Sequence, residues 1–158
     1  MIAHTTRYGI STTVPLDYVG AVEHTKQALA TESFGVLCEI DVAETLKRKL
    51  GVDFRPYVIL GACNPALAHQ ALVAERDLGL LLPCNVVVYA ADEAGHSVVA
   101  VLDPVEALQL SGNDAIRPIA RDVRARLIRV LEAIERSAAV AAIDPARLPD
   151  HTTRESTQ

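Results

Sequence analysis

Residues 57–65 read YVILGACNP and residues 81–89 read LLPCNVVVY. Each stretch joins an apolar, strand-like run to a Cys-Asn pair and a proline. Both faces of these runs are apolar, which predicts strands in a sheet that is covered on both sides. The two thiols, Cys63 and Cys84, therefore stand at strand ends, where chemistry or a tight structural constraint is common.

The composition is typical of one small domain. The chain has 158 residues, of which 50% are hydrophobic, and a net charge of -5 that argues against nucleic acid as a partner. No apolar run approaches the ~20 residues that cross a bilayer, and the first residues lack the apolar core of a signal peptide. The three cysteines fit neither a disulfide framework nor a zinc ribbon, so we expect a cytoplasmic protein with free thiols.

Hydrophobic periodicity predicts five strands and four helices. Strands are expected at about 8–14, 34–40, 56–62, 84–89 and 97–102, the last two joined in a hairpin. Helices are expected at about 15–33, 41–51, 64–77 and 116–137, the last with a core-facing seam formed by Ala120, Val123, Leu127, Val130 and Ile134. Asp41 and Asn64 are the expected N-caps, and residues 103–114 are expected to form a loose connection.

These elements predict an α+β fold with one domain over residues 1–140. We expect a roughly five-stranded, mixed or antiparallel sheet with about four helices mainly on one face. Because the central strands are apolar on both sides, something must cover the second face, and we expect a second copy of the chain in a homodimer. Helices wrapped over both faces of a monomer are the alternative. Residues 141–158 are polar and aperiodic, and we expect a disordered tail there.

The candidates for chemistry are the thiols Cys63 and Cys84 and the carboxylate Glu39. Cys63 precedes a helix N-terminus that could lower its pKa, which makes it the candidate nucleophile, although a small buried side chain is the simpler interpretation. Glu39 interrupts an apolar strand and needs a cation, for which Arg55 is the expected partner, either in a pocket or in a structural ion pair. No spacing of metal ligands accompanies Cys63 and Cys84, so no metal site is predicted. Cys38 alternates with Val36 and Ile40 and is expected in the core.

An ordered set of phrases resembles the domain of unknown function 302 family. The phrases are FGVL at 34–37, EIDV at 39–42, KLGVDFRPY at 49–57, ILGACNP at 59–65, LAH at 67–69 and LLLPCNVVVY at 80–89. The similarity covers about residues 7–138. It implies a small α+β domain that tends to form homodimers, and no accepted activity. It also implies recurrent positions at Glu39, Asp41, Arg55, Cys63, Asn64, Pro65, Cys84 and Asn85, which favours a pocket around the Cys-Asn pairs.

Three functions stay open. The favoured hypothesis is a homodimer that binds a small ligand or partner in a pocket lined by Glu39, Arg55, Cys63, Asn64, Cys84 and Asn85. The first alternative is a thiol-based redox enzyme or soft-metal-binding protein that uses Cys63 and Cys84. The second is a purely structural dimer, in which Asn64 and Asn85 serve only as a cap and a turn. The sequence names neither a cofactor nor a reaction.

Overall fold

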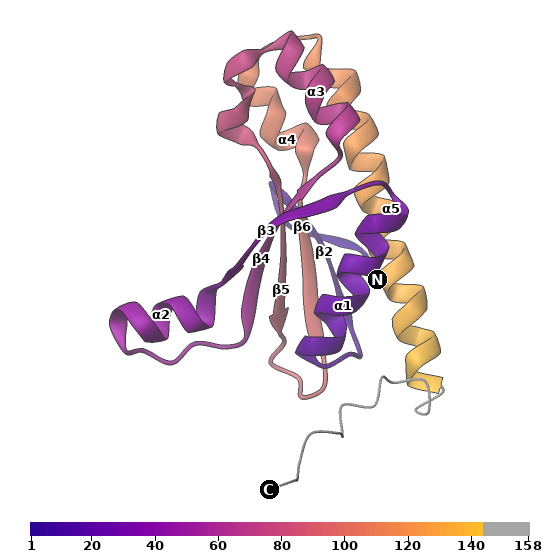
Figure 1. Ribbon diagram of the computed structural model, residues 1–158. Helices are drawn as coiled ribbons and strands as arrows, with labels where there is room; N and C mark the ends of the chain where they lie inside the picture. The colour runs from indigo at the N-terminus through magenta and orange to yellow at the C-terminus, as the bar shows by residue number, and fades with distance from the viewer. Residues whose placement is uncertain (144–158) are drawn as a thin grey trace, which may run out of the picture.

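The architecture is an antiparallel sheet with helices on one face and at its two ends (Figure 1). The computed structural model describes residues 1–143. Along the chain, the elements are β1 Ala3–Thr6, β2 Gly9–Val14, α1 Tyr18–Thr31, β3 Gly35–Asp41, α2 Val42–Leu50, β4 Tyr57–Cys63, α3 Pro65–Ala74, the 3₁₀ helix η1 Arg76–Leu81, β5 Cys84–Ala90, β6 Ser97–Leu102, α4 Pro104–Leu108, the 3₁₀ helix η2 Gln109–Ser111 and α5 Ile116–Ile143. Within the described residues, the six strands follow the order β1-β2-β6-β5-β4-β3.

The predicted α+β class is confirmed, and the five expected strands are present. The structure adds β1, whose four residues pair irregularly with β2 and therefore leave only a weak sequence pattern. Residues 103–114 are not a loose connection, because Asp103 accepts a hydrogen bond from the Val105 N–H and caps α4. Helix α5 continues to Ile143, so a tail beginning at residue 141 is wrong, and residues 144–158 of the expected tail lie outside the described residues.

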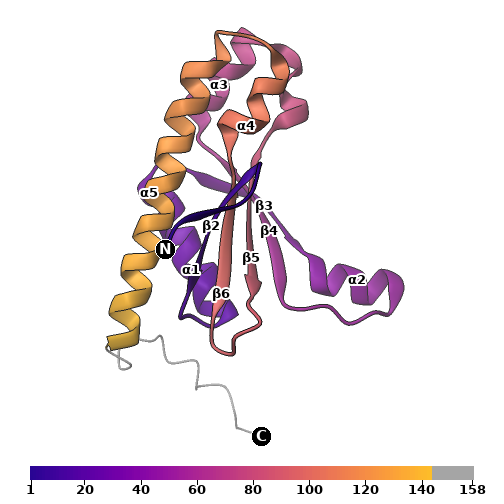
Figure 2. The ribbon, with the colours of Figure 1, turned by 180° about the vertical axis from the view of Figure 1, so that it is seen from behind.

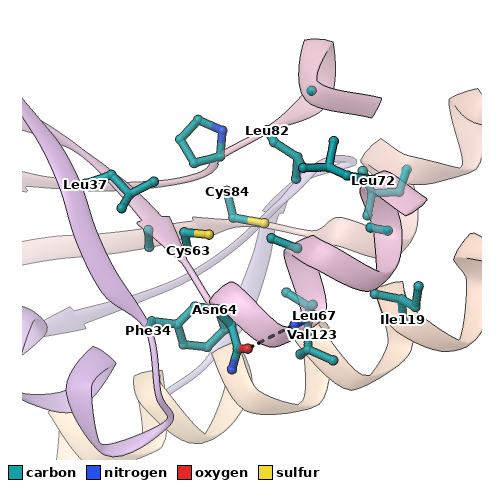
Figure 3. Close-up of a pocket in the computed structure, with 16 residues that line it drawn as sticks. Phe34, Leu37, Cys63, Asn64, Leu67, Leu72, Leu82, Cys84, Ile119 and Val123 are labelled. Carbon is teal, nitrogen blue, oxygen red and sulfur yellow. Dashed lines mark hydrogen bonds between the residues drawn. The ribbon is translucent and has the colours of Figure 1, made fainter. Parts of the chain in front are cut away.

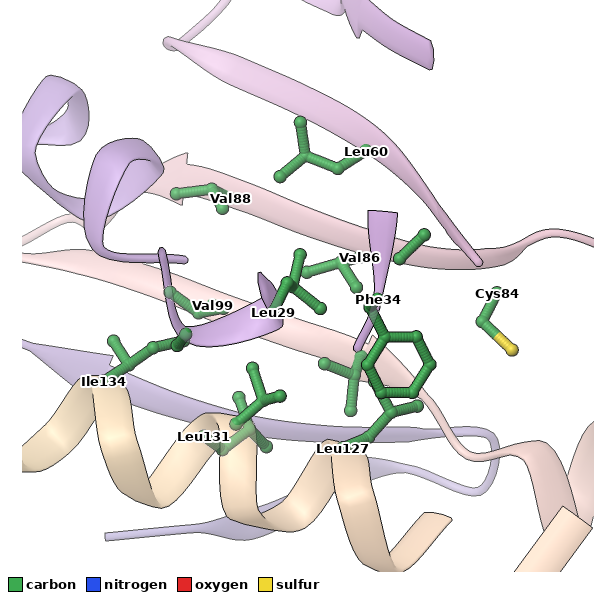
Figure 4. Packing of buried hydrophobic residues seen from close by; sticks show 14 of the residues in the cluster. Leu29, Phe34, Leu60, Cys84, Val86, Val88, Val99, Leu127, Leu131 and Ile134 are labelled. Atoms are coloured by element: carbon green, nitrogen blue, oxygen red, sulfur yellow. The ribbon is translucent and has the colours of Figure 1, made fainter. Parts of the chain in front are cut away.

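The hydrophobic core lies between the sheet and the helices α1 and α5 (Figure 4). Leu60, Val86 and Val99 of the three central strands are fully buried on this face of the sheet. Leu131 of α5 and Leu29 of α1 are fully buried against them. The seam predicted along α5 is confirmed, because its members are all buried: Ala120, Val123, Leu127, Val130 and Ile134.

The second face of the sheet is apolar as well, and it is half-buried. Tyr57, Ile59, Val87 and Tyr89 alternate with the fully buried residues of β4 and β5. The rings of Tyr57 and Tyr89 stack across the two strands, with centroids 5.2 Å apart. Helix α2 projects away from the body of the sheet (Figure 2), and none of its residues is buried. We call this apolar surface, formed by Tyr57, Ile59, Val87 and Tyr89, the open face.

A bulge in β3, between Val36 and Cys38, reverses which side chains of the strand point to each face of the sheet. Val36 lies opposite Ala62, but Cys38 lies opposite Gly61, so the register shifts between them. Cys38 is therefore exposed, and the expectation that it shares the core with Val36 is wrong. A Cβ atom at Gly61 would lie 2.6 Å from the Sγ atom of Cys38 and 3.0 Å from a ring carbon of Pro83. A larger residue at position 61 would therefore require the Cys38 side chain and the Pro83 ring to move.

The substitution Leu131→Ala tests the core. Leu131 is 0% exposed, so the truncation leaves a cavity and should lower the free energy of unfolding by about 2 to 5 kcal/mol. Urea unfolding followed by circular dichroism measures the change. The matched control is Leu110→Ala, since Leu110 is 77% exposed and its loss should change stability little. Equal effects of the two substitutions would contradict this description of the core.

Candidate functional site

An apolar pocket lies where the ends of β4 and β5 meet α3, α4 and α5 (Figure 3). Its volume is about 270 Å³, and sixteen residues line it. None of them is charged, and Asn64 is the lining residue whose side chain carries nitrogen and oxygen. The wall also includes Phe34, Leu67, Leu72, Ile119 and Val123. Such a concave apolar surface with very few polar groups is typical of sites for small molecules.

The start of α3 supplies one wall of the pocket. Asn64 is the N-cap, and its Oδ1 atom accepts a hydrogen bond from the Leu67 N–H at 3.2 Å. Pro65 occupies the first turn, where its missing N–H costs nothing. Both assignments agree with the sequence prediction. The cap fixes where the helix begins, and so it turns Leu67 toward the sheet, where Leu67 is buried.

The two thiols predicted to stand at strand ends come together in this pocket. Strands β4 and β5 are neighbours, and Ala62 lies directly opposite Cys84, so Cys63 follows one position further along. Cys63 is half-buried and Cys84 is buried. Both line the pocket, as Figure 3 shows.

The thiols are protonated near neutral pH. Burial raises the pKa of Cys63 above its usual value. Burial and the neighbouring Cys63 raise the pKa of Cys84 to about 11. Loss of solvent contact disfavours the Cys63 thiolate, so the structure does not support the alternative in which the helix N-terminus lowers the pKa of Cys63. Neither sulfur has the character of an activated nucleophile.

The charged candidates do not reach the pocket. Glu39 is about half exposed on β3 and pairs with Lys26 of α1, with Nζ and Oε1 2.6 Å apart. Arg55 instead binds Asp92 at 3.0 Å and the carbonyl oxygen of Ala90 at 3.2 Å. The expected ion pair between Glu39 and Arg55 does not form.

Asn85 also stands apart from the pocket, since it is exposed opposite Gly61. The structure thus brings together three of the six candidates, which are Cys63, Asn64 and Cys84. Within residues 1–143, no group of three or more His, Cys, Asp or Glu side chains comes together in a way that could hold a metal ion.

Much of the pocket wall comes from residues that the sequence pattern did not single out. Leu108 lies in α4, within the segment that was expected to be loose, and Ile119 lies beside the predicted seam of α5. Asp103-Pro104 repeats the N-cap and first-turn signal of Asn64-Pro65, so α4 had a recognisable start. The convergence of these distant segments carries no local signal.

Comparisons with known proteins agree with this fold. The family described as domain of unknown function DUF302 matches residues 10–134. A crystal structure of an uncharacterized conserved DUF302 protein from Bacillus stearothermophilus is 32% identical, with a TM-score of 0.74, and the match covers 82% of this chain and 99% of that chain. No curated protein matches the chain significantly. In the part of the chain that is described, no helix is long and apolar enough to cross a membrane.

Alkylation of the three thiols tests the pocket chemistry. At pH 8, iodoacetamide should modify the exposed Cys38 fastest and Cys84 slowest, because with a pKa of about 11 only about one Cys84 thiol in a thousand is ionised. The Cys84 rate should keep rising as the pH approaches 11. Peptide mass spectrometry measures each site, and the urea-unfolded chain, in which the three rates should converge, is the control. A Cys84 rate equal to that of Cys38 at pH 8 would contradict the raised pKa.

Proposed function

The chain belongs to the DUF302 family, and from this premise we propose that it is a homodimeric binding protein that holds a small apolar molecule in the pocket beside Cys63, Asn64 and Cys84. The family is described as one of unknown function, so membership does not assign an activity to the chain. The proposal rests on one observation, the uncharged pocket of about 270 Å³ at the junction of sheet and helices. Concave apolar pockets with few polar groups are typical of sites for small molecules, so a hollow of this size and lining supports a ligand.

The size of the pocket limits the ligand. A dry apolar cavity of about 150 Å³ in another protein accepts benzene, which has six heavy atoms. By proportion, the pocket of about 270 Å³ suits a molecule of up to about eleven heavy atoms. The exposed rim residues Leu37 and Leu72 lie where such a molecule would enter from solvent.

The thiol alternative has less support. A redox or soft-metal site works through thiolates, whereas burial raises the pKa of both Cys63 and Cys84. In the proposed function, the two protonated sulfurs act as soft, polarisable parts of the pocket wall. Free thiols also suit a reducing compartment, and on this ground we infer a cytoplasmic location.

The open face supports the homodimer. It is apolar across β4 and β5, and beyond its edge Ile40 and Phe54 are 47% and 48% exposed. Contiguous apolar surface of this kind marks an interaction site. A twofold axis lets two copies cover the same surface on each other, so one patch is enough for both partners. The pocket lies elsewhere, among α3, α4 and α5. A second copy can therefore cover the open face whether or not the pocket holds a ligand.

A cavity-filling substitution tests ligand binding. Ala68 is half-buried and lines the pocket, so in Ala68→Phe the added ring should occupy the site and weaken binding of indane, a nine-carbon hydrocarbon, at least about tenfold. NMR titration of the labelled protein measures the dissociation constant. The matched control is Ala66→Phe, which places the same ring on the exposed side of α3. Absence of saturable indane binding to the unmodified chain, with no change at lining residues, would contradict the proposal and favour a purely structural dimer.

An arginine on the open face tests the dimer. Sedimentation equilibrium of the unmodified chain should give about 34 kDa, twice the 17.0 kDa of one copy. Val87→Arg buries a charge in the interface and should give the mass of one copy, while Val73→Arg, at a position 74% exposed on α3, should leave the dimer intact. A mass of 17.0 kDa for the unmodified chain would rule out the homodimer.

A further inference from the structure

Helix α2 and the segment that follows it, residues 42–56, extend away from the rest of the chain, and we call them the arm. In both views the arm lies on the side of the sheet opposite α1 and α5 (Figure 1 and Figure 2). The open face lies on the same side, because its residues alternate with those that pack against α1 and α5. A molecule that covers the open face is therefore next to the arm.

Helix α2 has one apolar side. Its four apolar residues, Val42, Ala43, Leu46 and Leu50, fall within one sector of about 100° around the helix axis, and its polar residues occupy the rest. A helix of nine residues is marginal by itself and normally depends on the packing of such a side. None of these four residues is buried, and Leu50 is 68% exposed, so the apolar side of α2 stays partly uncovered in a single copy.

The uncovered apolar surface continues from the arm to the open face. Beyond α2, Val52 and Phe54 are 45% and 48% exposed. The ring of Phe54 lies beside that of Tyr57, with centroids 6.1 Å apart, and Tyr57 in turn stacks on Tyr89. Tyr57 and Tyr89 belong to the open face, so one contiguous apolar surface extends from β5 to the arm. Contiguous apolar surface of this kind marks an interaction site.

The charge of the arm favours a second copy of the chain as its partner. The arm carries four basic and two acidic residues, which are Lys47, Arg48, Lys49, Arg55, Glu44 and Asp53. The whole chain has a net charge of -5, so a positive arm meets a negative molecule when two copies associate. An anionic lipid surface also attracts a basic amphipathic helix. A flat surface, however, does not contact the open face and the arm together, because the arm stands out from the sheet (Figure 1).

We propose that the arm is a clasp between two copies of this chain. When two open faces meet, each arm packs the apolar side of α2, together with Val52 and Phe54, against the partner copy. Twofold symmetry makes the two contacts identical, so each copy contributes one arm and receives another. This inference rests on the homodimer of the proposed function, because it assigns the arm to the same assembly.

The substitution Leu50→Asp tests the clasp. It places a charge in the contact and should raise the dissociation constant of the dimer at least about tenfold, measured by sedimentation equilibrium of the full chain over a series of concentrations. Because Leu50 is 68% exposed in one copy, the variant should keep the circular dichroism spectrum of the unmodified chain. The matched control is Leu110→Asp, which adds the same charge at a leucine that is 77% exposed on η2 and should leave the dissociation constant unchanged.

Hydrogen exchange tests the clasp without a change in the arm. In the Val87→Arg variant, which should have the mass of one copy, the arm has no partner. The backbone amides of residues 47–50 should exchange at least about tenfold more slowly in the dimeric unmodified chain than in this variant, because opening α2 in the dimer also breaks contacts with the partner. Amides around the fully buried Leu131 are the control and should exchange at similar rates in both proteins.

The outcomes separate this inference from the proposed function. A mass of 17.0 kDa for the unmodified chain at every concentration would remove the homodimer, and the clasp with it. Equal dissociation constants for the Leu50→Asp and Leu110→Asp variants, or equal exchange of the α2 amides in dimer and monomer, would overturn the clasp and leave the homodimer standing. Cosedimentation of the chain with phosphatidylglycerol vesicles that Leu50→Asp abolishes would assign the arm to a lipid surface and would also overturn the inference.

Discussion

The fold and the pocket both depend on the register in which β4 and β5 pair. Leu60 lies opposite Val86, and Ala62 lies opposite Cys84. Because side chains alternate along a strand, this register turns both buried rows toward α1 and α5, and a slip of one residue would turn one row to the other face. The same register sets Cys84 beside Cys63 at one end of the sheet. The pairing that forms the core thus also forms the back wall of the pocket.

The pocket exists because α5 is longer than the sheet that it covers. Its 28 residues extend over about 42 Å, whereas the seven residues of β4 or β5 extend over about 23 Å. The turns of α5 that pass the sheet pack against α3 and α4 (Figure 1). At this end of the molecule α5 packs on the helices α3 and α4, whereas its neighbouring turns pack on the sheet. The pocket lies at the change between these two kinds of packing, where strand ends meet helix side chains.

The sequence predicted what local pattern controls. Alternation located the central strands, helical spacing located the seam of α5, and two helix caps were placed correctly. What it did not predict depends on tertiary context. The bulge that exposes Cys38 has no signature of its own, and the partner of Glu39 depends on where α1 lies. Three of the six candidate residues line the pocket because they belong to two adjacent strand ends, while the walls from α4 and α5 come from far along the chain.

Helix α2 illustrates a different kind of stability. It buries no residue, and nine residues are too few for an isolated helix to persist in water. Local bonds hold it instead: Asp41 caps its start through the Glu44 N–H, Gly51 ends it with a φ of 69°, and Lys47 reaches Asp53 at 2.7 Å. Its unfolding therefore breaks few contacts with the core, and it can open while the sheet stays formed. The chain thus carries, beside the packed sheet, a helix that depends more on its caps than on the hydrophobic core.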